Sequence, residues 1–162
     1  MSEHSDLLER LRRGAELVAV SITGAAGPEL DYTPKPGAWS IRQIVAHLSD
    51  SEIVATMRMR RIIAEDRPKL EAYDQNAWAT GLDYASRKTS QTLETFRRIR
   101  AENYELLKDL PVDAFERIGV HSERGPISLL QVVQDVAEHA ENHAQQLRNR
   151  RGEYKLFRAS TK

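Results

Sequence analysis

The chain has 162 residues, enough for one domain with a sizeable core, and its 24 basic and 24 acidic residues cancel. This balance gives no support for binding to nucleic acid or to an anionic membrane, and no apolar run approaches the roughly 20 residues that span a bilayer. Cysteine is absent, which excludes disulfides and thiolate ligands and fits a reducing compartment. We therefore expect one cytoplasmic domain over residues 1–162.

The first two helices are predicted from apolar spacing and capping residues. Leucines and valines recur on one helix face over about residues 6–22, and the proline-containing loop DYTPKPGAW follows. The second helix is expected to begin after Ser40, because Ser40 and Gln43 have the spacing of a capping box. Its apolar residues recur until Arg67 and Pro68, which end it.

A less regular stretch separates the second helix from the third. One helical turn is expected near residues 76–79, within an otherwise irregular segment. The third helix is predicted over about residues 84–109, with Asp83 as its N-cap and Pro111 just beyond its end.

The fourth helix is marked by a second capping-box pair, Ser128 and Gln131. Its apolar pattern continues to about Arg151, and Gly152 is expected to end it. No segment has a convincing strand pattern. The sequence therefore predicts an all-α fold, a four-helix bundle in a single domain.

Three of the five histidines fall inside predicted helices and on their apolar faces. His139 and His143, in EHAENHAQQL, are spaced four apart, so both rings leave the same helix face. His47 lies in a similar row of the second helix. Three neutral imidazoles can bind a divalent zinc, nickel, iron, cobalt or manganese ion and leave positions open, as in catalytic sites. The alternative is that they are hydrogen-bonded core residues.

A catalytic carboxylate is not evident from the pattern. The residue after His139 is alanine, so the metalloprotease motif is absent, and Glu141 should point away from the histidines into solvent. Asp135 lies one turn before His139 and is a candidate to accept its second ring N–H. Solvated charge is the favoured interpretation for each nearby acid: Asp50, Glu52, Asp135 and Glu138. Trp39 and Trp78 are candidates for a pocket mouth or for the core.

Two segments resemble the signatures of the DinB-like/YfiT-like metalloenzyme superfamily. KPGAWSIRQIVAHLSDSE, residues 35–52, is similar to the first signature, and GPISLLQVVQDVAEHAENHAQQL, residues 125–147, is similar to the second, H-x-x-N-H-x-x-Q-L. The resemblance covers nearly the whole chain. It implies a four-helix bundle, frequent homodimers and a three-histidine site for nickel, zinc or a similar ion. The ligands carry over to His47, His139 and His143, and Gln146 matches the pattern.

The resemblance leaves the reaction open, because members share a fold more than a chemistry. Some are thiol S-transferases and others are named hydrolases. We expect a metal-dependent enzyme that transfers a small cosubstrate thiol to an electrophilic small molecule, since the chain has no thiol of its own. The alternatives are hydrolysis by metal-activated water and a non-enzymatic metal-binding or interaction bundle.

Arginines form three clusters in the predicted helices. A nucleic-acid face and solvated helix faces are the two interpretations, and the zero net charge favours solvated faces. The clusters are Arg58, Arg60 and Arg61; Arg97, Arg98 and Arg100; and Arg148, Arg150 and Arg151.

Overall fold

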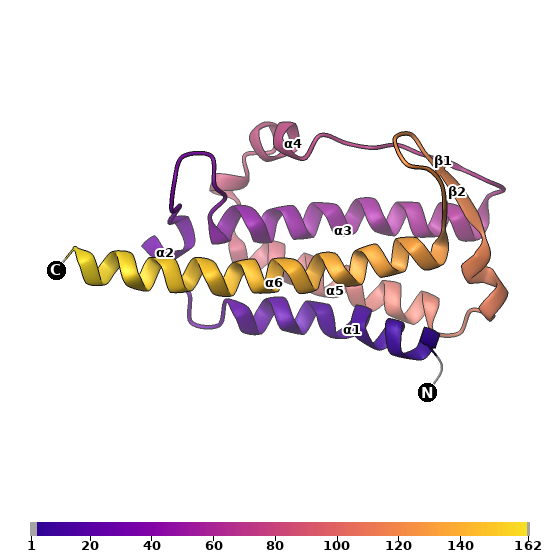
Figure 1. Cartoon of the computed structure of the whole chain (residues 1–162), viewed down its shortest axis with the longest axis horizontal. Coiled ribbons are helices and arrows are strands. Elements are labelled where there is room, and N and C mark those ends of the chain that lie inside the picture. The colour runs from indigo at the N-terminus through magenta and orange to yellow at the C-terminus, as the bar shows by residue number, and fades with distance from the viewer. Residues whose placement is uncertain (1–2, 162) are drawn as a thin grey trace.

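The computed structural model describes residues 3–161, and most of them are helical. Four long helices lie side by side along the long axis of the molecule (Figure 1): α1 (Glu3–Ser21), α3 (Ile41–Ala64), α5 (Thr89–Leu107) and α6 (Leu129–Ser160). This arrangement confirms the predicted four-helix bundle. Within the described residues, no helix has the length and apolar character needed to cross a membrane.

Both predicted capping boxes form. Ser40 Oγ accepts from the Gln43 backbone N–H, and the Gln43 side chain accepts from the Ser40 backbone N–H at 2.9 Å. Ser128 and Gln131 make the same pair of bonds at the start of α6. These caps satisfy backbone donors that a helix start leaves open. They also fix where α3 and α6 begin, and hence the turn on which each histidine lies.

Short elements connect the long helices. They are α2 (Pro28–Asp31), α4 (Gln75–Gly81), two 3₁₀ helices (Tyr84–Ser86 and Val112–Glu116) and the strands β1 (Lys69–Leu70), β2 (Ile118–His121) and β3 (Gly125–Ser128). β2 pairs in parallel with β1 and antiparallel with β3, at one end of the bundle (Figure 1). The expectation of no strand is therefore wrong, because strands of two to four residues are too short for a visible alternation.

The start of α5 differs from the prediction. Asp83 has a left-handed backbone, with φ of 46°, and its side chain caps no helix. The segment Tyr84–Ser86 forms a separate 3₁₀ turn, and α5 begins at Thr89. A left-handed residue stops helical propagation, and the sequence pattern did not reveal it.

The end of α6 also differs, because the helix continues through Gly152. Glycine within a helix costs only about 1 kcal/mol relative to alanine. Contacts on both sides of it hold the last turns in place: Arg151 Nε donates to Glu29 at 2.7 Å, and the Tyr154 ring lies 5.4 Å from the Tyr32 ring. Tertiary packing therefore outweighs the helix stop that the sequence predicts.

Arg100 joins α5 to the other three long helices. Its guanidinium binds the Glu52 carboxylate of α3 through two hydrogen bonds of 2.9 and 2.7 Å. The same group donates to the backbone carbonyls of Leu11 in α1 and Val136 in α6. Gly14 leaves room for it, since a Cβ atom at this position would lie 2.8 Å from Arg100 Nη1. A single fully buried arginine thus fixes the centre of the bundle.

Candidate metal centre

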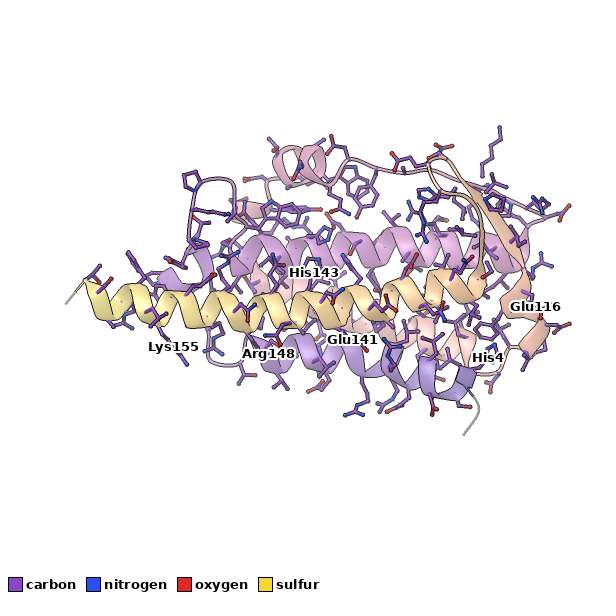
Figure 2. The ribbon with its side chains drawn as sticks, viewed as in Figure 1. His4, Glu116, Glu141, His143, Arg148 and Lys155 are labelled. Carbon is purple, nitrogen blue, oxygen red and sulfur yellow. The ribbon has the colours of Figure 1, made fainter. Side chains whose placement is uncertain are left out.

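Three imidazoles converge between α3 and α6. His47 belongs to α3, and His139 and His143 belong to α6, where Figure 2 shows His143 on the side facing α3. His139 Nε2 lies 3.0 Å from His47 Nε2 and 3.0 Å from His143 Nε2. One ring nitrogen from each residue falls within 4.8 Å of the others. The structure therefore brings together the three residues chosen from the sequence, here called the three-histidine cluster.

Hydrogen bonds between the rings do not account for both contacts. Gln146 Oε1 lies 2.7 Å from His143 Nδ1, and because an amide oxygen accepts, the His143 proton belongs on Nδ1 and its Nε2 is an acceptor. His139 Nε2 faces two ring nitrogens at once, but a single N–H can align with only one of them. At least one of the two 3.0 Å contacts therefore has no hydrogen bond across it.

A bound cation would give all three ring nitrogens a common partner. Two nitrogens each about 2.0–2.1 Å from a tetrahedral zinc ion stand about 3.3 Å apart, close to the separations in the cluster. The hydrogen bond from His143 Nδ1 to Gln146 also orients the ring, as partners of metal-ligating histidines do. The chemistry of the three residues therefore fits a divalent metal ion held through three Nε2 atoms.

Burial keeps the cluster uncharged near neutral pH. It lowers the pKa of His47 to about 4, with a smaller contribution from His143. Burial, followed by repulsion from His143, His47 and Arg100, lowers the pKa of His139 to about 3. Burial also lowers the pKa of His143, against the effect of the Gln146 hydrogen bond. Because neutral imidazole is the metal-binding form, the rings are ready for an ion at pH 7.

These shifts predict that the metal-free protein loses stability in mild acid. The unfolded chain takes up protons on its histidines near pH 6.5, whereas His47 and His139 stay neutral in the folded state, so protonation favours unfolding. Between pH 7 and pH 5 we expect the free energy of unfolding to fall by about 2 kcal/mol for each of these two residues. Urea titrations across this range measure the change, and His47→Ala should show a shallower dependence. Equal slopes in the two proteins would contradict the prediction.

The two tryptophans lie in different places relative to the cluster. The Trp39 ring lies 5.0 Å from the His47 ring, and the Trp78 ring of α4 packs on Tyr73 at 4.5 Å. His47 Nδ1 is buried and has no hydrogen-bond partner among the described residues, so packing orients this ring. Trp39 therefore contacts the cluster directly. Trp78 packs on Tyr73, which lines the pocket described below.

The nearby acids are mostly engaged with arginines. Asp135 is exposed, as the favoured interpretation expected, and it forms an ion pair with Arg124 rather than the alternative bond to His139. Glu52 is buried against Arg100. Asp50 is also buried. Solvation was therefore the wrong expectation for both Glu52 and Asp50. Arg100 offsets the cost of burial for Glu52, and Arg87 lies 3.7 Å from the Asp50 carboxylate.

The two remaining acids near the histidines, Glu138 and Glu141, belong to α6. Glu138 is exposed, as expected. Glu141 points away from the cluster and toward α1 (Figure 2), but it binds Arg10 through bonds of 3.0 and 2.8 Å and is not simply solvated. This pair ties α6 to α1 and leaves Glu141 out of reach of the histidines.

A pocket of about 290 Å³ opens beside His139. Its walls come from α3, α6 and the segments around β1 and β3. We call it the arginine pocket, and its lining residues are Ser51, Glu52, Val54, Ala55, Arg58, Tyr73, Gln75, Arg124, Asp135, Val136 and His139. Sequence analysis named His139, Glu52 and Asp135 of this set and placed Arg58 in a basic cluster. It did not single out Tyr73 or Gln75, because only the tertiary structure brings them to the pocket.

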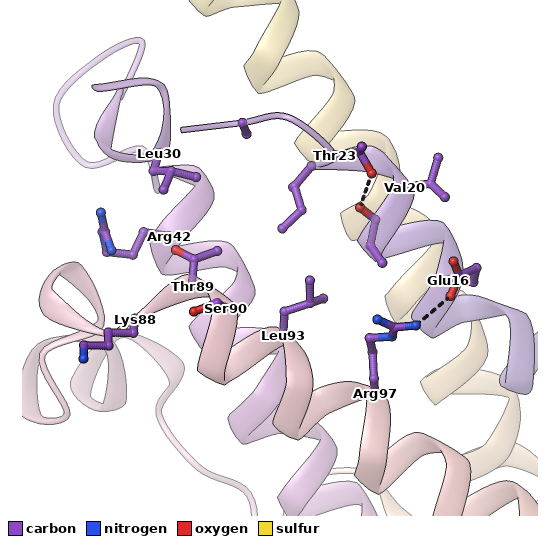
Figure 3. A pocket seen from close by; sticks show the side chains of 13 residues that line it. Glu16, Val20, Thr23, Leu30, Arg42, Lys88, Thr89, Ser90, Leu93 and Arg97 are labelled. Carbon is purple, nitrogen blue, oxygen red and sulfur yellow. Dashed lines mark hydrogen bonds and ion pairs between the residues drawn. The ribbon is translucent and has the colours of Figure 1, made fainter. Parts of the chain in front are cut away.

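A larger groove of about 640 Å³ lies elsewhere, between α1 and the start of α5 (Figure 3). Leu93 and Ile22 contribute apolar surface, and Glu16 and Arg97 form an ion pair along one edge. None of the three histidines of the cluster lines this groove. The size of a cavity therefore does not identify the candidate site. The smaller arginine pocket contacts the cluster through His139.

The arginine clusters contain both buried arginines and arginines that form ion pairs at the surface. Arg100 and Arg150 are buried, so the expectation of solvated faces is wrong for these two. Arg61 binds Glu65, Arg98 binds Glu94, and Arg151 binds Glu29.

Comparison with known proteins decides the family. The sequence model described as "DinB superfamily" matches residues 7–147. The chain belongs to the DinB superfamily. A provisionally named metal-dependent hydrolase of Oceanobacillus iheyensis is 31% identical over 115 residues, which are 71% of this chain and 66% of that protein. A like-named protein of Halalkalibacterium halodurans is 30% identical over 117 residues, 71% of this chain and 67% of its own length.

A solved structure shows the same fold. YfiT from Bacillus subtilis, described as a probable metal-dependent hydrolase with an unusual four-helix bundle topology, has a TM-score of 0.84 and 23% sequence identity. The alignment covers 94% of this DinB superfamily chain and 90% of the YfiT chain. The resemblance seen in the two sequence signatures is thereby confirmed for family and fold.

Proposed function

We propose that this protein is a metal-dependent enzyme that acts on a small molecule, with hydrolysis as the first candidate reaction. The observation that carries the proposal is the convergence of three neutral imidazoles beside the arginine pocket. A divalent ion held by three histidines keeps open positions, where it can lower the pKa of a water toward about 7 or hold a thiol as thiolate. The names of the relatives support hydrolysis.

In this proposal the chain's own residues hold and shield the site. Gln146 keeps the His143 proton on Nδ1 and so presents Nε2 to the ion. Trp39 packs on the His47 ring and restricts water on that side. The arginine pocket admits the substrate next to His139. Zinc and nickel are the proposed ions, because nitrogen ligands without sulfur suit both.

Thiol transfer is the second candidate, and the carboxylates favour it. Glu52 is held by Arg100, and Asp135 by Arg124, so neither is free to take a proton from water. A thiol that reacts as thiolate has less need of such a base. The thiol would come from a cosubstrate, since the chain has no cysteine.

Thiol dependence of turnover tests the two candidates. Metal-loaded protein is assayed with an activated ester and with a chlorinated aromatic electrophile, each with and without a small thiol. Ester cleavage without thiol supports hydrolysis, and electrophile turnover that requires thiol supports transfer. In either case His139→Ala should lower kcat/KM by at least about 100-fold, because it removes a ligand rather than a ligand's partner. Activity that is unchanged in this variant would contradict the proposal.

A further inference from the structure

Arg58 has a guanidinium that forms no ion pair within residues 3–161, at the wall of the arginine pocket. Its Nη2 donates to the backbone carbonyl of Glu71 at 2.6 Å, but its Nε is buried and has no acceptor within residues 3–161. No carboxylate in this part of the chain forms an ion pair with it. A partly buried cation loses hydration, and a neutral carbonyl compensates for only part of that loss.

The other charged residues that line the pocket are held in ion pairs. Asp135 is neutralised by Arg124 at the rim, and Glu52 is neutralised by Arg100 below the floor. Arg58 is then the lining arginine that forms no ion pair, and the Asp135 carboxylate that acts on it at longer range is already paired with Arg124. Counted together, Glu52, Asp135, Arg58, Arg100 and Arg124 leave one positive charge in excess at the pocket, although the chain as a whole has no net charge.

The neighbours of Arg58 are suited to an oxyanion. Tyr73 and Gln75 line the same pocket and can donate hydrogen bonds from their hydroxyl and amide groups. A guanidinium can present two N–H groups side by side to the oxygens of a carboxylate or phosphate. The volume of about 290 Å³ is at the lower end of ligand pockets, which limits the occupant to a small molecule.

We propose that Arg58 binds a carboxylate or phosphate group of a small anionic substrate, and that this contact places the rest of the substrate against His139. The inference rests on the proposed function, since it names the substrate class of the same site. His139 and Arg58 line one pocket, so one small molecule reaches both. Uncharged molecules of the same size would leave the Arg58 charge uncompensated and bind more weakly.

Direct binding tests the inference without relying on turnover. Titration calorimetry is run with succinate, inorganic phosphate and uncharged dimethyl succinate, on both metal-free and zinc-loaded protein. We expect one of the two anions to bind at least about tenfold more tightly than the diester, and this preference identifies carboxylate or phosphate as the recognised group. Arg58→Gln should reduce anion affinity by about tenfold or more.

Arg98→Gln is the matched control. It removes the same charge from an exposed arginine of α5 that does not line the pocket, and anion affinity should stay within about twofold. Arg58→Lys keeps the charge but not the fork of donors, so it should bind more weakly than the native protein and more tightly than Arg58→Gln. If Arg58→Gln does not fold, the affinity of Arg58→Lys compared with that of the native protein still tests the inference.

The outcomes separate the inference from the proposed function. Equal binding of the anions and the diester, or equal losses in Arg58→Gln and Arg98→Gln, would overturn the inference even if zinc binds stoichiometrically. Anion binding that depends on Arg58 in a protein that takes up no metal would support the anion site and refute the proposed function. Anion binding that depends on Arg58, in a protein that also binds zinc, would support both the inference and the proposed function.

Discussion

Replacing His139 with alanine is expected to abolish stoichiometric binding of zinc or nickel. His139 Nε2 is the nitrogen that contacts both other rings, so its loss leaves His47 and His143 without the central ligand. Loss of a partner of a ligand costs 10- to 100-fold in metal affinity, so loss of the ligand itself should cost more than about 100-fold. Elemental analysis after exhaustive dialysis, together with zinc titration of the metal-free protein, measures the effect.

His4→Ala is the control for this experiment. His4 packs on Phe115 and lies outside the three-histidine cluster, so the variant removes a histidine without touching the site. It should keep the metal content and zinc affinity of the native protein. Native affinity in His139→Ala, with the helical circular dichroism unchanged, would show that the cluster is not the metal site.

The largest expected effect on stability comes from Glu52→Ala. The change leaves Arg100, which is 1% exposed, without a carboxylate in the centre of the bundle, and it removes an acceptor of Asn103. Removing one partner of a buried ion pair costs about 3–5 kcal/mol. Urea unfolding monitored by circular dichroism measures this loss, and the midpoint should fall with little change in slope.

Glu94→Ala provides the comparison on the surface. Glu94 and Arg98 form an exposed pair one helical turn apart, which is worth about 0.3–0.5 kcal/mol. The double variant Glu52→Leu with Arg100→Met should be more stable than Glu52→Ala, because it removes both buried charges. If Glu52→Ala and Glu94→Ala had similar unfolding free energies, the central role of Arg100 would be wrong.

Local signals in the sequence predicted the framework of the bundle. The pairs Ser40–Gln43 and Ser128–Gln131 place the starts of α3 and α6 correctly, because a capping box depends on residues only three positions apart. The grouping of the three histidines also followed from helical spacing. Whether they hold a metal ion remains a prediction that the experiments above address.

Features that depend on distant residues were not predictable in this way. Glu52 and Arg100 look like ordinary helix charges in the sequence, and only the tertiary structure brings them together across 48 positions. Gly152 looks like a stop until the contacts of Arg151 and Tyr154 are known. Arg58 belongs to a basic run, and its lack of a counter-charge becomes visible only when the pocket around it is assembled.

The separation of the histidines along the chain affects how the cluster can form. His47 and His139 are 92 positions apart, so no local fragment contains the complete cluster. Contacts between distant residues form late, because closing a long loop costs entropy before packing compensates. The pair on α6 alone offers an ion only two ligands until α3 docks. Tight ion binding and completion of the native tertiary structure should therefore coincide, which would make ion retention a reporter of correct folding.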